Sequence, residues 1–209
     1  MQKNHGPLTK DSTIRSALRN ILSGDLENCR QSGHQAEVFE ELGICHGTTR
    51  IDFAIINGLM HGYEIKSDRD TLKRLPEQVK EFSNVFDRMT LVVGKHHLYH
   101  AIHVIPDWWG VIVAKINANN KIIFQTIRES EDNKEQAEIS IARLLWREEA
   151  LRILEEQNEA IGMRTKPREI LYKKLTEILD IQTLKETVSS LLIAREGWRS
   201  DPQLLSNGG

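Results

Sequence analysis

The sequence has little cysteine, no long hydrophobic run and almost no net charge. Its only cysteines are Cys29 and Cys45, which excludes a disulfide-stabilised scaffold and favours a reduced, intracellular chain. No apolar run approaches the roughly 20 residues of a membrane-spanning helix, and residues 1–10 lack the apolar core of a signal peptide. We therefore expect a cytoplasmic protein without a membrane partner.

The charge balance excludes a strong global attraction to nucleic acid. The chain carries 28 basic and 30 acidic residues, a net charge of -2, so any binding to DNA must come from a local basic patch. Hydrophobic residues make up 39% of the 209 residues and charged residues 28%, as in ordinary globular proteins. A chain of this length can bury a sizeable core as one domain with an appended helical part.

The first 130 residues alternate between helical and strand patterns. Apolar spacing predicts a helix over residues 11–23 and a loop over 24–36, whereas residues 36–44 fit either a helix or a strand. A pair of strands joined at Asn57-Gly58 is predicted over residues 50–66, followed by a helix that begins or kinks at Pro76. Three more strands are predicted over residues 89–94, 108–116 and 121–127.

The strand pattern stops after about residue 131. Helical patterns cover residues 134–158, 167–179 and 180–196, with Asp180 as an N-cap and Gly197 at a helix C-terminus. We therefore predict an α/β core over residues 1–130 and an all-helical C-terminal region over residues 131–209.

Three charged residues of the predicted hairpin are candidates for catalysis. Side chains alternate along a strand, so Glu64 and Lys66 project from the same face. A two-residue Asn57-Gly58 turn would place Asp52 opposite Tyr63, on the wrong face. A three-residue loop over residues 56–58 places Asp52 opposite Gly62 instead, about 7–8 Å diagonally from Glu64. We predict this bulged loop, with the small Gly62 leaving space over the site.

These residue types suit metal-assisted phosphodiester hydrolysis. Mg²⁺ takes few oxygen ligands from a protein and leaves positions for water and a substrate phosphate. The ion polarises the phosphoryl group and lowers the pKa of water. Lys66 can hold the attacking water or neutralise charge that develops on the phosphate. The alternative interpretation is an ordinary ion pair on the exposed side of a sheet, which contributes about 0–1 kcal/mol.

The stretch RIDFAIINGLMHGYEIKSDRD, residues 50–70, resembles the PD-(D/E)xK nuclease superfamily, which has the restriction-endonuclease-like fold. In that superfamily an Asp precedes a hairpin and a (D/E)xK triplet ends the next strand, here Asp52 and Glu64-Ile65-Lys66. The RecB-type branch adds a helical Gln, often as QxxxY. Gln78 matches the Gln, whereas Phe82 stands in the place of the Tyr. The resemblance covers roughly residues 36–115 and extends to uncharacterised bacterial proteins with this core and a helical tail.

The resemblance implies a mixed central sheet flanked by helices, in the core order helix, three strands, helix, strand. It implies a deoxyribonuclease dependent on Mg²⁺ or Mn²⁺, with DNA preferred to RNA as substrate and endonuclease action among the options. Asp52 and Glu64 would bind metal together with Glu41, for which Glu40 and Glu37 are substitutes, and Lys66 and Gln78 would complete the catalytic set. A homodimer and a protein partner on the C-terminal helices are further expectations.

Two other functions stay open from the sequence. The same fold could be a catalytically silent module that binds DNA or a protein. Alternatively, the chain could be an adaptor that dimerises through its C-terminal helices, which would require an apolar stripe on their surface.

Several residues outside the hairpin allow both a functional and a structural interpretation. Phosphate contacts are conceivable for Arg50, Ser67 and Lys80. Four histidines between residues 96 and 103 fit a polar helix face better than a zinc site. Trp108 and Trp109 could stack on bases or fill the core. A basic cluster could follow a DNA backbone or face solvent, and consists of Arg164, Lys166, Arg168, Lys173 and Lys174.

Overall fold

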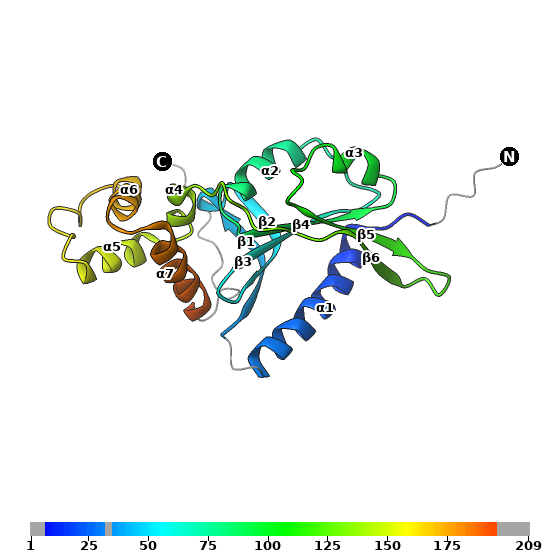
Figure 1. Ribbon diagram of the computed structural model, residues 1–209, viewed down its shortest axis with the longest axis horizontal. Coiled ribbons are helices and arrows are strands. Elements are labelled where there is room, and N and C mark those ends of the chain that lie inside the picture. The colour runs from blue at the N-terminus through cyan, green and yellow to red at the C-terminus, as the bar shows by residue number, and fades with distance from the viewer. Residues whose placement is uncertain (1–6, 32–34, 196–209) are drawn as a thin grey trace, which may run out of the picture.

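A single mixed sheet forms the centre of the computed structural model, which describes residues 7–31 and 35–195 (Figure 1). The strand order in the sheet equals the order in the chain: β1 (Glu37–Ile44), β2 (Thr49–Ile56), β3 (Met60–Lys66), β4 (Arg88–Gly94), β5 (Gly110–Ile116) and β6 (Ile122–Arg128). Strands β3, β4 and β5 run parallel, and the other neighbours are antiparallel. The ambiguous segment 36–44 is thus a strand.

Helices cover both faces of the sheet. The helices of the described residues are α1 (Asp11–Gln31), α2 (Leu75–Ser83), α3 (Leu98–Ile102), α4 (Glu138–Ala142), α5 (Arg147–Glu156), α6 (Arg168–Ile178) and α7 (Ile181–Ala194). Helix α1 lies on one side and α2 and α3 on the other, whereas α4 to α7 gather beyond the β1 end of the sheet (Figure 1). The predicted class, an α/β core followed by a helical C-terminal region, is confirmed. In the described part of the chain, no helix combines the length and the apolar content needed to cross a bilayer.

Helix α1 is longer than its sequence pattern predicted. The loop expected over residues 24–36 is wrong for residues 24–31, because the helix continues through Gly24 to Gln31. An isolated glycine is tolerated inside a helix, and the buried side chains Ile14, Leu18 and Leu22 anchor α1 on Phe53 and neighbouring residues of the sheet.

The C-terminal helices share their hydrophobic core with the opposite face of the sheet. Leu144, Leu171 and Leu184 belong to the same buried cluster as Phe39 and Met89 of β1 and β4. Lys185 of α7 forms an ion pair with the buried Asp87, whose carboxylate also accepts a hydrogen bond from the Met60 amide at 2.7 Å. The division near residue 130 stays a prediction, since packing is continuous across it.

Local signals at the ends of the helices account for several boundaries. Pro76 lies in the first turn of α2, as predicted. The carboxylate of Asp180 accepts hydrogen bonds from the amides of Gln182 and Thr183, which confirms it as the N-cap of α7. Gly197 lies outside the described residues.

The β2–β3 hairpin has the predicted loop length but a different register. Asn57, Gly58 and Leu59 form the loop, with Gly58 at φ 96°, and Ile56 pairs with Met60. The prediction that Ile55 pairs with Leu59 is therefore wrong by two positions. The physical reason is burial, because this register keeps the fully buried Ile56 in the strand and leaves Leu59, which is 43% exposed, in the loop.

Gly62 has a packing role that the sequence did not indicate. It pairs with Ala54, and a Cβ atom at this position would lie 2.5 Å from the sulfur of Met89 and 3.2 Å from the ring of Phe86. The space at Gly62 is thus filled by the core and does not open over the site.

We expect Gly62→Ala to destabilise the protein by about 1–3 kcal/mol, because the added methyl group overpacks the core. Gly24→Ala is the matched control: nothing lies within 4 Å of its added Cβ on α1, so it should stabilise by about 0.5–1 kcal/mol. Urea denaturation of both variants measures the two changes. Equal stabilities would contradict the assigned packing.

Candidate active site

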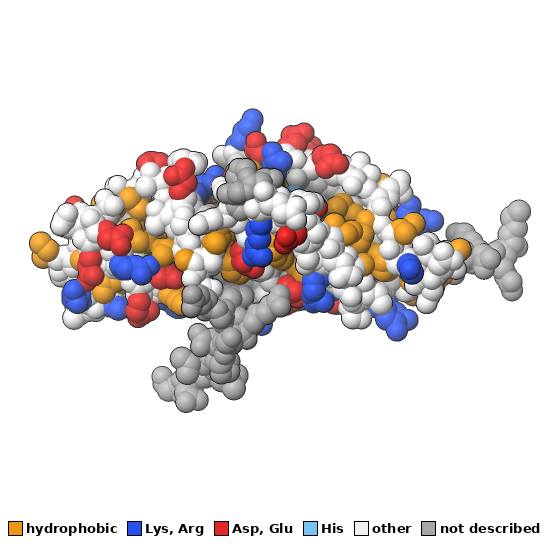
Figure 2. All heavy atoms as spheres, turned by 90° about the horizontal axis from the view of Figure 1, so that it is seen from below, with side chains coloured by type: hydrophobic (Ala, Val, Ile, Leu, Met, Phe, Trp, Pro, Cys, Tyr) orange, Lys and Arg blue, Asp and Glu red, His pale blue; other side chains and the backbone are white. Residues whose placement is uncertain are grey.

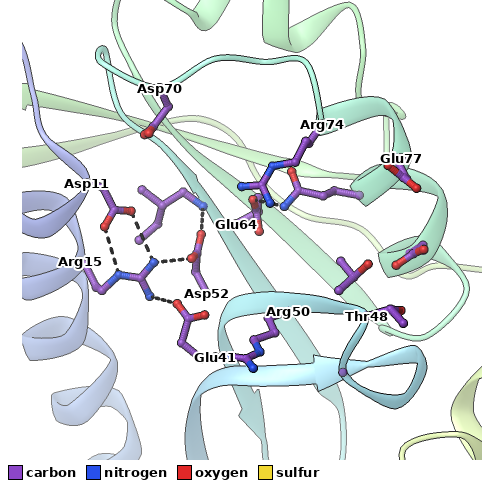
Figure 3. Close-up of a pocket in the computed structure, with 15 residues that line it drawn as sticks. Asp11, Arg15, Glu41, Thr48, Arg50, Asp52, Glu64, Asp70, Arg74 and Glu77 are labelled. Atoms are coloured by element: carbon purple, nitrogen blue, oxygen red, sulfur yellow. Dashed lines mark hydrogen bonds and ion pairs between the residues drawn. The ribbon is translucent and has the colours of Figure 1, made fainter. Parts of the chain in front are cut away.

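A cavity of about 540 Å³ opens between α1, α2 and the first three strands (Figure 3). Its lining is strongly acidic, with Asp11, Glu41, Asp52, Glu64, Asp70, Glu77 and Glu81. The basic side chains in the lining are Arg15, Arg50 and Arg74. Such a cavity attracts cations and repels phosphate unless a cation is bound.

Three of these carboxylates form a row across β1, β2 and β3. The last residue pair between β2 and β3 is Phe53 with Tyr63. Beyond this pair, β2 still pairs with β1 and β3 still pairs with β4. Continuing the register by one residue places Asp52 opposite Glu64. On the other side, the β1–β2 register places Asp52 opposite Glu41, which adopts a positive φ of 54°. The three predicted ligands Glu41, Asp52 and Glu64 therefore line one cavity.

Asp52 occupies the gap where β2 and β3 part. Its Oδ2 atom accepts a hydrogen bond of 2.6 Å from the Ile65 amide, and its Oδ1 atom pairs with Arg15. Arg15 also lies 2.8 Å from a carboxylate oxygen of Glu41 and 3.3 Å from one of Asp11 (Figure 3). One guanidinium from α1 thus neutralises carboxylates from two strands.

Glu64 is buried with two donors on the α2 side of the sheet. Lys66 pairs with its Oε1 atom, and the Gln78 amide donates to the same oxygen at 2.6 Å. Both partners are among the predicted residues, and Lys66 stands behind Glu64 without lining the cavity itself. Exposure of Glu64 is only 2% and that of Lys66 is 5%, so this pair is no exposed surface ion pair.

Three oxygens of this cavity are buried without a hydrogen-bond partner: Oε2 of Glu64, Oε1 of Gln78 and Oε2 of Glu81. Unpaired buried acceptors are costly in a native structure. Oxygen donors of this kind are those that Mg²⁺ and Mn²⁺ prefer, so the donor set fits a hard divalent ion. In the described residues no three Asp, Glu, His or Cys side chains lie close enough to enclose an ion, and Arg15 and Lys66 are paired with the central carboxylates.

Burial changes the acidity of the two central carboxyl groups. Desolvation raises the pKa of Asp52, although Arg15 and the Ile65 amide oppose this shift. Desolvation and the nearby Asp52 carboxylate raise the pKa of Glu64 to about 7, despite Lys66 and Gln78. Carboxyl groups with shifted acidity in a cavity are typical of functional sites.

The remaining predicted residues divide between the cavity and other environments. Arg50 lines the cavity. Glu40 pairs with Arg19 and Glu37 with Arg30, so neither substitutes for Glu41. The Ser67 hydroxyl oxygen accepts a hydrogen bond from the Arg69 amide within a turn. Neither Ser67 nor Lys80 lines the cavity.

The histidines and tryptophans have mainly structural contacts. His96 contacts the Asp68 carboxylate, and His97 contacts the Asp70 carbonyl, both at 2.9 Å. Trp109 is fully buried and Trp108 packs partly against the same core. The described residues around these histidines form no metal cluster.

The basic cluster of the C-terminal region includes paired side chains. Arg164 lies 2.5 Å from Glu155, and Lys174 lies 2.8 Å from Glu159. Figure 2 shows basic and acidic side chains mixed over this region, on the left of the view. For these two residues the solvent-facing interpretation fits better than a continuous DNA-binding surface.

Arg15 and Glu81 line the site but were missed in the sequence. Both have a signal at helical spacing: Arg15 follows Asp11 by four residues, and Glu81 follows Gln78 by three, which places each pair on one helix face. Only the tertiary structure shows that these two faces meet the same strands.

The family of this chain emerges from comparison with known proteins. A family model described as bacteriophage P4 protein cII matches residues 9–206. The chain belongs to this family. Protein cII of Enterobacteria phage P4 is 32% identical over 93 residues, which are 44% of this chain and 35% of the phage protein. The match thus spans about a third of the length of that relative.

One solved structure is also similar, a protein of unknown function from Silicibacter pomeroyi. The alignment has 18% identity and a TM-score of 0.37, and it covers 72% of this chain and 87% of that protein. The resemblance to PD-(D/E)xK nucleases stays a prediction beside these findings.

We expect Arg15→Met to destabilise the protein by about 3 kcal/mol, since it leaves the largely buried Asp52 without its cation. Arg19→Met is the matched control. Both guanidinium groups lie over the Phe53 ring, at 5.7 and 6.0 Å, but the Arg19 side chain is 43% exposed and that of Arg15 only 20%. The control should lose about 0–1 kcal/mol. If urea denaturation showed similar losses of unfolding free energy in the two variants, Arg15 would have no special role in stabilising Asp52.

The raised pKa of Glu64 predicts a pH dependence of stability. An exposed glutamate has a pKa of about 4.3, so between that pH and about 7 the unfolded chain is ionised while folded Glu64 keeps its proton. The stability that Glu64 contributes is present below about pH 4.3 and is lost as pH rises to about 7. In EDTA, the free energy of unfolding of the unaltered chain should therefore fall relative to that of Glu64→Gln over this range. A pH-independent difference would exclude the shift.

Proposed function

We propose that this protein is a metal-dependent nuclease that hydrolyses phosphodiester bonds, in DNA rather than RNA. The observation that carries the proposal is the row of Glu41, Asp52 and Glu64 at the point where two strands part, with Lys66 beside it. This arrangement supports the resemblance to PD-(D/E)xK nucleases, because Asp52 and Glu64 belong to adjacent strands and line one cavity, with Lys66 paired to Glu64. The proposed compartment is the cytoplasm, and a homodimer would allow both strands of a duplex to be cut.

The carboxylates would hold one or two Mg²⁺ or Mn²⁺ ions. Glu64 Oε2 is a buried oxygen without a hydrogen-bond partner, and Asp52 and Glu41 present further carboxylate oxygens that now face Arg15. When bound, the ion would polarise the phosphoryl group and promote deprotonation of water.

The remaining side chains would orient the reactants. Lys66 carries its ammonium group next to Glu64, where it can hold a water molecule or stabilise charge on a phosphate oxygen. Gln78 donates to Glu64 with its NH₂ group, which leaves its carbonyl oxygen as an acceptor for a water proton. Arg15 can move from the carboxylates to a phosphate once a metal ion neutralises them.

A catalytically silent binding module is the main alternative. It is favoured by the pairing of Asp52 with Arg15 and of Glu64 with Lys66, which neutralises the carboxylates without a metal. Against it stand the unpartnered oxygens of Glu64 and Glu81, because an inactive site has no need for them.

A dimerising adaptor has less support from the surface of the C-terminal helices. The large hydrophobic side chains exposed there, among the described residues, are Trp146, Ile161 and Ile170. They lie on different segments, not on the continuous apolar stripe that an adaptor would require.

Supercoiled and linear plasmid DNA, each with Mg²⁺, Mn²⁺ or EDTA, would test the proposal directly. We expect cutting only with metal, and a loss of at least about 100-fold in Asp52→Ala and Lys66→Ala, as for removal of a group that stabilises the transition state. Cutting of the supercoiled circle would indicate endonuclease action. Absence of cutting under every condition would favour the silent module.

Matched variants separate the site from general effects of charge. Glu41→Ala should reduce the rate, whereas Glu40→Ala, its neighbour on β1, should not, because Glu40 lies outside the cavity. Lys80→Ala is the corresponding control for Lys66→Ala. Equal losses in Glu40→Ala and Glu41→Ala would count against the assigned ligand set.

A further inference from the structure

A second cavity lies between the core and the C-terminal helices, and the proposed chemistry does not use it. Its volume is about 390 Å³, and its lining includes residues of η1 (Cys45–Gly47) and of α5 and α6. The charged lining is dominated by arginines: Arg143, Arg147, Arg168 and Arg195, against a single carboxylate, Glu148. This cavity therefore has the opposite charge character from the acidic site.

Two of the four arginines have no carboxylate partner among the described residues. Arg143 pairs with Glu169 at 2.8 Å, and Arg195 pairs with Glu149 at 2.5 Å. Arg147, in contrast, donates to the backbone carbonyl groups of Arg164 and Lys166, and no ion pair or hydrogen bond within the described chain engages Arg168. Since Arg147 and Arg168 are also the first residues of α5 and α6, the positive ends of both helices border the cavity.

An aromatic side chain completes the lining. Trp146 is 46% exposed, which is unusual for a residue that could pack in the adjoining core. The guanidinium of Arg195 lies 4.3 Å from the centre of the Trp146 ring. The Arg195 side chain is almost fully buried and forms an ion pair with Glu149. The ring is thus held in a fixed position with much of its surface open to a ligand. Exposed aromatic rings beside arginines stack on unpaired nucleic-acid bases.

The two cavities are neighbours. Gly47 lines both of them, so the short turn η1 forms the boundary between the acidic site and the arginine cavity. A polynucleotide bound at the acidic site has phosphates on both sides of the bond that is cut, and these gain nothing from the surrounding carboxylates. Cationic groups one step along the strand would supply the missing attraction.

We propose that the arginine cavity binds a single-stranded nucleic-acid segment next to the proposed cleavage site. In this assignment, which rests on the proposed function, Arg147 and Arg168 hold backbone phosphates and Trp146 stacks on a base. A single strand fits better than a duplex, because stacking on the exposed Trp146 ring needs a base free of its pair.

Fluorescence anisotropy of labelled dT12 in EDTA would measure this binding without cleavage. We expect Arg147→Ala/Arg168→Ala to bind dT12 at least about tenfold more weakly. The slope of log affinity against log salt should fall by about 1.4, since each phosphate contact on a single strand contributes about 0.7. Trp146→Ala should weaken binding severalfold or more, and a duplex of the same length should bind less tightly than dT12.

Arg152→Ala/Arg164→Ala is the matched control, because it removes the same charge from exposed side chains of this region that lie outside the cavity. It should keep most of the affinity for dT12. If the Arg147 variant unfolds, Arg168→Glu provides a second test, since it alters an exposed side chain without partners among the described residues. Wild-type affinity in either cavity variant, a loss equal to that of the control, or tighter binding of the duplex would overturn the assignment.

The binding and cleavage measurements fail independently. Asp52→Ala should lose cutting and still bind dT12. Binding that depends on Arg147 and Arg168 in a protein that never cuts DNA would support the cavity and refute the nuclease. Metal-dependent cutting with dT12 affinity unchanged in Arg147→Ala/Arg168→Ala would refute the cavity and leave the nuclease supported.

Discussion

The carboxylate of Asp52 in the gap between β2 and β3 is the contact on which the candidate site depends. Backbone pairing between the two strands ends next to Asp52. There the Asp52 carboxylate accepts the hydrogen bond of the Ile65 amide, in place of a backbone carbonyl group of β2. The strands can therefore part without leaving a buried amide unsatisfied. Their separation creates the space in which Glu41, Asp52 and Glu64 line one cavity.

This arrangement concentrates negative charge in a buried place, which would be unstable without compensation. Arg15 reaches the strands from α1, while Lys66 and Gln78 reach Glu64 from β3 and α2. Helices on both faces of the sheet thus contribute to one electrostatic network. The oxygens of Glu64, Gln78 and Glu81 that remain unpartnered indicate that the compensation is incomplete in the protein alone.

The C-terminal helices contribute arginines to a second cavity, whose charge is opposite to that of the acidic site. They pack into the hydrophobic cluster on the α2 face of the sheet, and this packing brings α5 and α6 to the η1 turn beside the acidic cavity. An acidic cavity and an arginine-lined cavity thus become neighbours. The family model of bacteriophage P4 protein cII covers both regions, since its match runs from residue 9 to residue 206.

The sequence by itself determined the α/β class, the hairpin over residues 50–66 and the Asp180 cap, because these depend on local periodicity and capping chemistry. Strand alternation and the expected hairpin indicated Asp52, Glu64 and Lys66 as one group, whereas Gln78 was indicated by the resemblance to PD-(D/E)xK nucleases. The tertiary structure alone decided the hairpin register, because burial of Ile56 kept this residue in the strand and left Leu59 in the loop. It also decided the positions of Arg15 and Glu81, and the closeness of the two cavities. These depend on contacts between segments far apart in the chain, which no local pattern specifies.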